Sequence, residues 1–317
     1  MATGEIVDDE TLGGAEMHST VSGVSDYFAE DEYDAIRLAR NVVQNLNFQK
    51  KTKIPENLNF KEPIYDVEEI LGIVQSNIRS PFDSRELIAR IVDGSRFCEF
   101  KPKYGTTLIC CEAKLYGITI GILSNNGVLF SDSSNKGTQF IQLCNQRNIP
   151  LLFLQNITGF MVGKEYERGG IIKHGAQFIN AVSNSTVPAI TIVIGSSYGA
   201  GNYAMMGRSY HPRFLFSYPN SKCSVMGEEQ LAGVMDLILR KNLKSSGMKI
   251  DEKMINKRKQ AFIDSVKKHS DVYYTSSKAI DDGIIDPRDT RQILGICLSA
   301  IFSEKVEGNS FSGVSRL

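Results

Sequence analysis

The segment Leu151–Met206 decides the fold, because it contains the same arrangement twice: a short apolar strand, a glycine-rich break and a helical pattern. The first copy begins with the predicted strand Leu151-Leu-Phe-Leu-Gln155. The break Asn156-Ile-Thr-Gly-Phe-Met-Val-Gly163 follows, and a helical pattern then covers Gly170–Val182. We call this break the first glycine turn.

The second copy starts with the predicted strand Ala189-Ile-Thr-Ile-Val-Ile194. The break Gly195-Ser-Ser-Tyr-Gly-Ala-Gly201, which we call the second glycine turn, leads into Asn202–Met206. Each turn is expected to present free backbone N–H groups at the start of a helix, which suit an anion or a developing oxyanion. Glycine in one such turn is commonly explained by packing alone. For two such turns on adjacent strands, packing and a functional role are equally good explanations of the glycines.

The rest of the pattern indicates a layered α/β fold. Two apolar runs, Thr107–Ala113 and Ile118–Leu123, flank Tyr116-Gly117 and predict a hairpin with a tight turn. From Ile118 onward strands alternate with helices, which favours parallel βαβ units. Further strands are predicted at 128–130, 214–218 and 223–227, and helices at 32–46, 67–75, 85–92, 138–148, 228–240, 242–270 and 290–302.

The N-terminal part differs in composition from the rest. Residues 1–23 are polar and contain glycine, which is typical of a flexible leader. Asp31 has the position of a helix N-cap. Asn47–Glu62 is polar, carries Lys50, Lys51 and Lys53, and is the predicted linker.

Composition excludes several classes of protein. The 317 residues include 36 lysines plus arginines and 36 aspartates plus glutamates, so a bulk basic surface for nucleic acid is not expected. The six cysteines form no C-x-x-C pair, and we interpret them as reduced core residues of an intracellular protein rather than a disulfide frame or a zinc site. No apolar run of membrane length, signal peptide or transit peptide is expected in this chain.

Familiar catalytic motifs are missing. The second glycine turn does not read G-x-G-x-x-G, and the sequence has neither a Walker A lysine nor G-x-S-x-G. His174 follows the first glycine turn, where a general base is one reading and a surface histidine paired with a carboxylate is the favoured one. No convincing acid–base pair emerges, which agrees with chemistry supported by backbone N–H donors.

Several runs together resemble one family. Asn156–Gly163, Tyr198-Gly-Ala-Gly-Asn-Tyr203, Val225-Met-Gly227 and Asp281-Asp-Gly-Ile-Ile-Asp-Pro287 are similar to the carboxyltransferase subunits of biotin-dependent acyl-CoA carboxylases. Within that family, Asn156-Ile-Thr-Gly-Phe160 most resembles the β subunits of methylcrotonoyl-CoA carboxylases. The resemblance covers almost the whole chain.

This resemblance implies a crotonase-like ββα superhelix, in which each subunit carries two such domains. Residues 1–46 would then be the end of an N-terminal carboxyltransferase domain, 47–62 a linker and 63–317 the C-terminal carboxyltransferase domain. In the family, active sites form between the first domain of one subunit and the second domain of another. Most of a first domain is therefore expected outside this chain.

The implied reaction is carboxyl transfer from carboxybiotin to the γ-carbon of 3-methylcrotonyl-CoA. Backbone N–H groups at Gly199 and Ala200 would stabilise the biotin enolate, and Gly159 and Phe160 would shape the neighbouring pocket. No metal is expected. The resemblance also implies a set of residues that bind the acyl-CoA: Phe97, Tyr104, Gly105, Asn125, Asn126, Gly127 and Tyr198.

The resemblance further implies a biotin-carrying α subunit as partner, self-association as a dimer of trimers, and a mitochondrial-matrix location in a eukaryote or a cytoplasmic one otherwise. Three alternatives remain open at this point. The chain is an enzyme part that needs an N-terminal half, a truncated and inactive relative that serves in assembly, or a carboxyltransferase or decarboxylase for another acyl-CoA such as propionyl-CoA.

Overall fold

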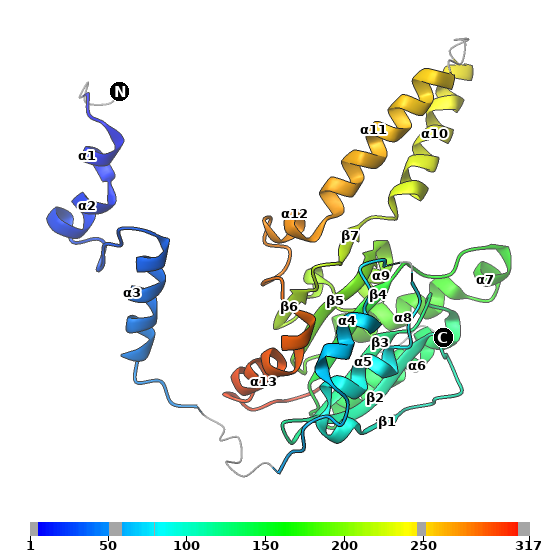
Figure 1. Ribbon diagram of the computed structural model, residues 1–317, viewed down its shortest axis with the longest axis horizontal. Helices are drawn as coiled ribbons and strands as arrows, with labels where there is room; N and C mark the ends of the chain where they lie inside the picture. Colours follow the sequence, from blue (N-terminus) through cyan, green and yellow to red (C-terminus); the bar gives the residue numbers. More distant parts are fainter. Residues whose placement is uncertain (1–5, 51–58, 79, 246–251, 310–317) are drawn as a thin grey trace. The chain divides into compact units, whose positions relative to one another are not determined.

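The computed structural model describes residues 6–50, 59–78, 80–245 and 252–309 (Figure 1). It divides into two compact units, residues 1–51 and 52–317. Residues 51–58 of the predicted linker lie outside the described residues. The assignment of residues 1–46 to the end of an N-terminal carboxyltransferase domain and of 63–317 to the C-terminal one stays a prediction.

The first unit consists of short helical segments, α1 (Asp9–Gly13), α2 (Ala15–Met17) and the π turn η1 (His18–Ser22), followed by α3 (Glu32–Gln44). The flexible leader predicted for 1–23 is therefore helical over 9–13 and 15–22. The Asp8 carboxylate accepts the Thr11 N–H at 2.8 Å and caps α1.

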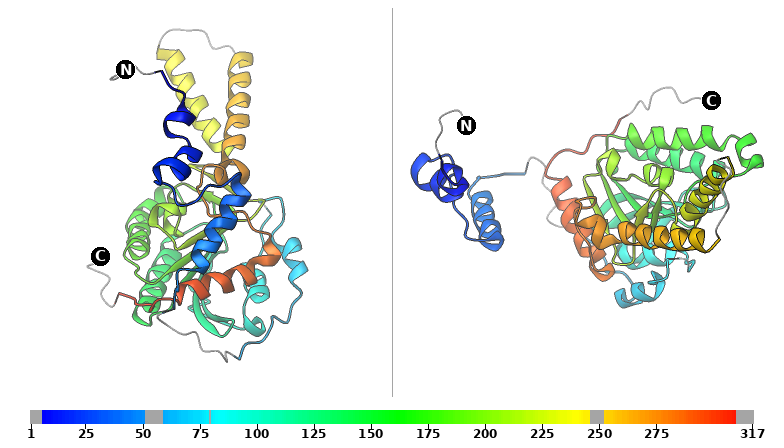
Figure 2. Two further views of the ribbon diagram at one scale, coloured as in Figure 1. Left: turned by 90° about the vertical axis from the view of Figure 1, so that its left-hand side faces the viewer. Right: turned by 90° about the horizontal axis from the view of Figure 1, so that it is seen from above.

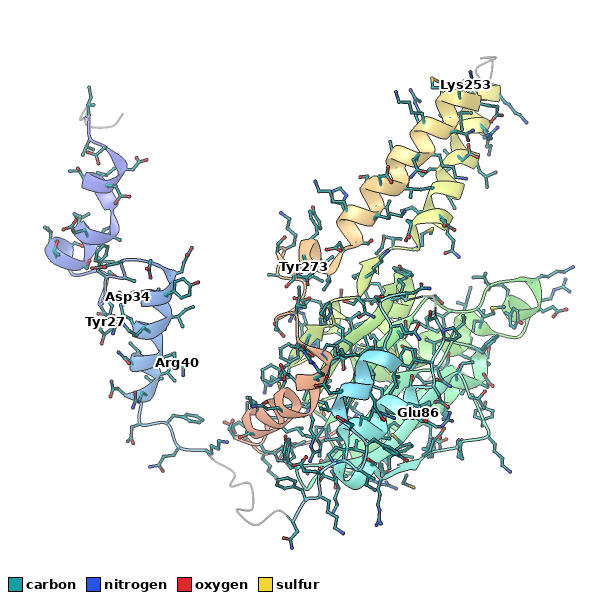
Figure 3. All side chains as sticks on the ribbon, in the orientation of Figure 1. Tyr27, Asp34, Arg40, Glu86, Lys253 and Tyr273 are labelled. Carbon is teal, nitrogen blue, oxygen red and sulfur yellow. The ribbon has the colours of Figure 1, made fainter. Side chains whose placement is uncertain are left out.

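Helix α3 confirms the predicted helix to within two residues. Its N-cap is Asp31, whose carboxylate accepts the Asp34 N–H at 2.8 Å. No residue of α3 is buried, although its apolar residues recur on one side. Figure 3 shows Asp34 and Arg40 among the side chains that project from this helix.

One sheet organises the second unit, in the order β1-β2-β3-β4-β5-β6, with β7 also pairing with β5. Strands β1 to β3 are antiparallel, and β3 to β6 are parallel. The predicted hairpin is confirmed, with Tyr116 and Gly117 at positive φ in its two-residue turn. The strands are β1 (Phe97–Glu99), β2 (Leu108–Leu115), β3 (Ile118–Asn125), β4 (Leu151–Ile157), β5 (Ala189–Tyr198), β6 (Phe214–Ser217) and β7 (Lys222–Ser224).

Helices cover both faces of the sheet (Figures 1 and 2). On one face α6 (Ser131–Gln146) and α8 (Ile171–Ser183) pack side by side. The other face carries α4 (Ile70–Ile73), α5 (Ser84–Ile91) and α13 (Thr290–Ile301). This alternation of strands and covering helices confirms the predicted parallel βαβ units.

The remaining helices connect or extend these layers. Helices α10 (Glu228–Ser245) and α11 (Glu252–Ser270) pack as a pair that extends away from the sheet, with Tyr273 of α12 (Val272–Ser276) near its base (Figure 3). No helix in the described residues is long and apolar enough to cross a membrane. The shorter elements are α7 (Lys164–Arg168), α9 (Gly199–Ala204) and the 3₁₀ turns η2 (Val67–Glu69), η3 (Asp93–Ser95), η4 (Arg208–Tyr210) and η5 (Pro287–Asp289).

The core centres on β4 and β5. All ten residues of β5 are buried, as expected for a strand covered on both faces. Burial of each large aliphatic or aromatic side chain contributes roughly 1.5–3 kcal/mol. Because β5 is buried to its last residue, its carboxyl end places Ser196, Ser197 and Tyr198 inside the protein.

Several predicted boundaries are wrong. Strand β4 continues to Ile157 and β5 to Tyr198, so the second turn begins only at Gly199. Helix α6 starts at Ser131 instead of residue 138, because the Ser133 and Ser134 hydroxyls bond the Phe130 backbone and cap the helix. Residues 128–130 form only a bridge at Leu129. The predicted helix 242–270 is divided between α10 and α11, with 246–251 outside the described residues.

Candidate active site at the carboxyl ends of the parallel strands

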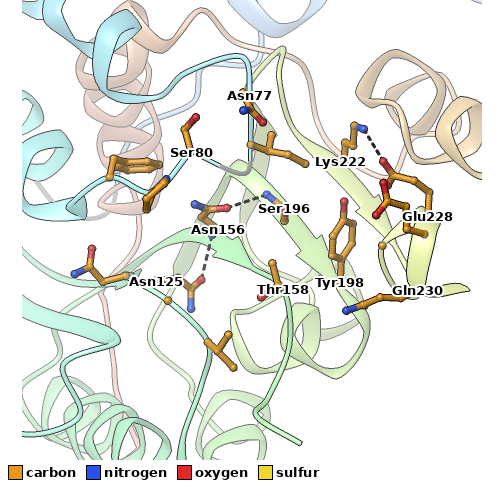
Figure 4. Close-up of a pocket in the computed structure, with 18 of the residues that line it drawn as sticks. Asn77, Ser80, Asn125, Asn156, Thr158, Ser196, Tyr198, Lys222, Glu228 and Gln230 are labelled. Atoms are coloured by element: carbon orange, nitrogen blue, oxygen red, sulfur yellow. Dashed lines mark hydrogen bonds and ion pairs between the residues drawn. The ribbon is translucent and has the colours of Figure 1, made fainter. Parts of the chain in front are cut away.

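The carboxyl ends of β3, β4 and β5 meet the first residue of β7 at a cavity of about 660 Å³ (Figure 4). Open α/β sheets bind ligands at this edge, where side chains from several strands converge. The strand ends contribute mainly amide and hydroxyl groups: Asn125, Asn126, Asn156, Thr158, Ser196 and Tyr198. The cavity is therefore suited to a ligand that is recognised by hydrogen bonds.

A side-chain ladder ties the three strand ends together. The Oδ1 of Asn125 accepts the Asn156 N–H at 3.1 Å, and the Oδ1 of Asn156 accepts the Ser196 N–H at 3.0 Å. The register changes here: Gln155 pairs with Val193, but Ile157 pairs with Ser197. One residue of β4, Asn156, thus lies opposite three residues of β5. Its side chain supplies the acceptor that the interrupted ladder lacks.

The second glycine turn joins β5 directly to α9. Gly199 has φ +54°, and a Cβ at this position would lie 2.8 Å from the Val225 carbonyl oxygen. Only glycine fits such a position without strain. The Tyr198 side chain does not cap α9, and Ala200 is exposed. The first N–H groups of a helix have no partner within the helix, so they are available to a ligand.

The first glycine turn has a different construction. The Leu129 N–H bonds the Gly159 carbonyl at 3.2 Å, and the Met161 N–H bonds the Leu129 carbonyl at 2.8 Å. Helix α7 begins only at Lys164. The predicted helix after this turn is confirmed by α7, which follows Gly163 directly, and by α8 over the predicted residues 170–182, but the bridge to Leu129 places Gly159 and Phe160 before the helix start instead of at it. Within the described residues, the N–H groups of Gly159 and Phe160 donate no backbone hydrogen bond.

The two glycine turns lie against each other. A Cβ on Gly201 would lie 3.4 Å from the Cα of Gly159 and would overlap the Ile157 side chain. The structure thus brings Gly159 next to the start of α9. The Phe160 ring packs on α8, where it would contact a Cβ on Gly175 at 3.0 Å.

The residues predicted to bind acyl-CoA fall into two groups. Asn125, Asn126, Gly127 and Tyr198 line the cavity.

The other three lie elsewhere. Phe97 lines a separate pocket of about 910 Å³ beside Asp93, Tyr104 lines a shallow one beside Lys101, and Gly105 packs on the Ser133 backbone. The acyl-CoA roles of both groups stay predictions.

The cavity residues that received no role from the sequence include Asn156, Ser196, Lys222 and Glu228. The Nζ of Lys222 lies 3.7 Å from an Oε1 of Glu228 at the cavity wall. For Asn156 and Ser196 a signal existed, since both are polar residues at the ends of apolar strands. For Lys222 and Glu228 the sequence holds no comparable signal, because the chain turns back to bring them to the cavity.

Two titratable side chains outside the cavity lining bear on the sequence predictions. Burial raises the pKa of the Cys223 thiol, and its hydrogen bond with Ser197 opposes this shift. His174 is half-buried, and its Nδ1 has no partner among the described residues, so the predicted carboxylate pairing is wrong. The described part of the chain contains no group of three or more residues that could hold a metal ion.

Comparison with known proteins gives a consistent result. A family model described as "Carboxyl transferase domain" matches residues 1–312. The chain is 54% identical to a probable biotin-dependent acyl-coenzyme A carboxylase beta2 subunit of Mycobacterium tuberculosis, over 100% of this chain and 60% of the relative. It is 50% identical to the mitochondrial methylcrotonoyl-CoA carboxylase beta chain of Dictyostelium discoideum, over 96% of this chain and 52% of the relative.

A solved structure extends the likeness to three dimensions. The beta subunit of geranyl-CoA carboxylase from P. aeruginosa is 42% identical and superposes with a TM-score of 0.77, over 99% of this chain and 60% of that one. The fold is crotonase-like, as the resemblance implied. The chain spans between half and two thirds of the length of these relatives.

Proposed function

The chain belongs to the carboxyl transferase domain family of biotin-dependent acyl-CoA carboxylases, and from this membership we propose that it acts in carboxyl transfer to 3-methylcrotonyl-CoA. The product would be 3-methylglutaconyl-CoA, an intermediate of leucine breakdown. One structural observation carries the proposal. The second glycine turn presents the start of α9 beside a cavity to which the strand ends contribute mainly amides and hydroxyls, with Gly199 at a positive φ. Such a turn holds negative charge without a side-chain base.

The residues present fit biotin as the carboxyl carrier. Its ureido oxygen accepts hydrogen bonds, and the exposed first turn of α9 offers N–H donors at Gly199 and Ala200. When bound, biotin supplies a transferable carboxyl group. Gly159 would allow close approach of the ligand, because a Cβ there meets no atom within 4 Å. Phe160 would limit the pocket on the side of α8.

The acyl-CoA would occupy the cavity at the strand ends. Asn125 and Asn126 present amide groups there. Tyr198, the last residue of β5, adds a buried aromatic ring. Developing negative charge on the thioester carbonyl needs donors held in place, which backbone N–H groups and fixed amides supply. We include Phe97, Tyr104 and Gly105 as more distant parts of the acyl-CoA site.

The complete enzyme is part of the proposal, because the chain spans only 52–60% of its relatives. We propose a biotin-carrying α subunit as partner, self-association into a dimer of trimers, and a mitochondrial-matrix location, as the name of the Dictyostelium discoideum relative suggests. Regions of the relatives that this chain does not match would complete the acyl-CoA site.

The decisive experiment measures fixation of labelled bicarbonate by the full-length protein with its biotin-bearing partner. The acceptors would be 3-methylcrotonyl-CoA, geranyl-CoA and propionyl-CoA. Preference for 3-methylcrotonyl-CoA supports the proposal, and preference for another acceptor changes the substrate but keeps the reaction. Assembly without acyl-CoA binding or turnover would favour the inactive assembly protein instead.

A further inference from the structure

We propose that Gln155, Ser197 and Asn202 are positioning residues that hold the second glycine turn in the geometry its N–H groups require. We call these three side chains the buried amide cluster. The inference rests on the proposed function, because the turn matters only if it binds charge during the reaction. None of the three residues lines the cavity, so they act through the turn and not on the ligand.

The first contact closes the turn upon itself. The Asn202 Nδ2 donates a hydrogen bond to the Ser197 Oγ at 2.7 Å. Ser197 lies near the end of β5 and Asn202 lies in α9, so this bond joins the two sides of the turn. The enclosed residues are Tyr198, Gly199, Ala200 and Gly201. A single hydrogen bond therefore holds together the two ends of the segment that carries the proposed N–H donors.

The second contact connects this hydrogen bond to the neighbouring strand β4. The Ser197 Oγ donates to the Gln155 Oε1 at 2.7 Å. The Gln155 Nε2 donates in turn to the Met205 carbonyl, just beyond the last residue of α9, with a longer contact of 3.5 Å to the Asn202 carbonyl. Helix α9 is thus held at Asn202, in its second half, and at Met205, just beyond its end, by side chains of β4 and β5.

The donor and the acceptor of every hydrogen bond in the buried amide cluster follow from one group, the Met205 backbone carbonyl. A backbone carbonyl only accepts, so Gln155 must turn its Nε2 toward Met205 and its Oε1 toward Ser197. The Ser197 hydroxyl must then donate to Gln155. Its oxygen is left to accept, from the Cys223 thiol and from Asn202, which must present its Nδ2 rather than its Oδ1. The three side chains therefore have one consistent arrangement.

Burial makes this arrangement rigid. Gln155 and Ser197 are both 0% exposed, so water does not replace a lost bond. Helix α9 has only six residues, and so short a helix has little stability of its own. Its position must come from tertiary contacts. A displacement of about 1 Å at a reacting centre can reduce a rate by about a hundredfold.

The test uses the full-length protein with its biotin-bearing partner. Asn202→Ala and Ser197→Ala remove parts of the cluster, and Ser197→Thr keeps the hydroxyl as a rescue variant. Tyr218→Phe is the matched control. It removes a buried hydrogen bond of 2.6 Å between the hydroxyls of Tyr218 and Thr290, which line neither the cavity nor a glycine turn.

Two measurements separate positioning from a purely structural role. Amide hydrogen exchange over residues 198–206 should accelerate by about tenfold in Asn202→Ala, as expected for the loss of one hydrogen bond. The same amides should be unaffected in Tyr218→Phe. The kcat of Asn202→Ala and Ser197→Ala should fall by about 10- to 100-fold with an unchanged KM for acyl-CoA, and Ser197→Thr should restore part of it.

The outcomes distinguish this inference from the proposed function. Wild-type protein that transfers no carboxyl group overturns the function, while the exchange measurement still tests the cluster. Unchanged exchange over residues 198–206 in Asn202→Ala overturns the cluster in every case. Faster exchange with unchanged kcat shows that the cluster only stabilises the fold, which also overturns the proposal.

Discussion

The two glycine turns follow neighbouring strands, touch each other and look alike in sequence, yet the protein holds them in different ways. The first turn is held by backbone hydrogen bonds between Leu129 and the residues Gly159 and Met161. The second is held by buried side chains of Gln155, Ser197 and Asn202. Main-chain bridging leaves the first turn as an extended loop. Side-chain anchoring instead places a helix start at the end of β5.

The difference shows how one local signal leads to two structures. Glycine permits the positive φ that both turns adopt, but it does not decide whether the next helix starts at once, as α9 does, or after a loop, as α7 does. The partner of each turn decides that. A parallel bridge to Leu129 keeps the backbone of the first turn extended. The second turn lies against the Val225 carbonyl and is held by the buried amide cluster. We therefore expect substitutions in the second turn to have the larger effects.

The largest effect is expected for Gly199→Ala. An L-residue at φ +54° costs about 1–2 kcal/mol, and its Cβ would lie 2.8 Å from the Val225 oxygen. Relief of this contact moves the Val225 carbonyl or the turn itself, and a shift of the turn displaces the N–H of Ala200. We expect kcat to fall by about 10²- to 10³-fold, the effect of losing one oxyanion donor. Steady-state kinetics of the assembled enzyme measure this, and a loss below tenfold would contradict a role for the turn in charge stabilisation.

The next largest effect is expected for Asn156→Ala, because the Asn156 side chain connects the two turns. Its Oδ1 accepts the Ser196 N–H at 3.0 Å, so the variant leaves a buried donor unsatisfied. We expect a loss of about 1–3 kcal/mol in the free energy of unfolding, measured in urea. Asn156→Asp keeps an acceptor at the same place and serves as the control. Equal losses in both variants would show that the ladder bond is unimportant.

A smaller effect is expected for Gly159→Ala in the first turn. Gly159 has φ +140°, so alanine is strained there, but its Cβ would meet no atom within 4 Å. The loop can therefore relax, and we expect a loss near the lower end of the range for backbone strain, about 1 kcal/mol. Thermal unfolding and kinetics would be measured beside Gly199→Ala. If the two variants lose the same activity, the contrast between the turns is wrong.

The smallest effect concerns pH and lies outside both turns. The Arg288 guanidinium, helped by the Arg288 N–H, lowers the pKa of Asp286 to about 2. The ordinary value is about 3.9, so this pair stabilises the fold above that pH and loses its contribution as the pH falls toward 2. The Asp286 side chain is 37% exposed, which limits the contribution to less than about 1 kcal/mol.

Urea unfolding at pH 5 and at pH 2.5 would measure this contribution as the difference between wild type and Asp286→Asn. The difference should shrink at the lower pH. Because the pair does not contact either turn, acid should not change the ranking of the glycine variants. A reversal of that ranking at low pH would show that a titrating group supports one of the turns.

Much of the fold follows from the sequence alone. Apolar runs such as Leu151–Gln155 and Ala189–Ile194 predict buried parallel strands, because a strand covered on both faces must be apolar throughout. The dipeptide Tyr116-Gly117 predicts the hairpin, and Asp31 predicts the start of α3. These signals are local, since they depend on backbone geometry and on the immediate neighbours in the chain.

Other features required the tertiary structure. The continuation of β5 to Tyr198 depends on Asn156 of another strand, and the polar residues at its end look like a loop in the sequence. Lys222 and Glu228 reach the cavity only because β7 pairs with β5. The sequence by itself determined where the chain bends and which residue types gather at the strand ends. Only the tertiary structure decided which turn receives a buried side-chain anchor, because hydrogen bonds between distant residues depend on how the strands pack.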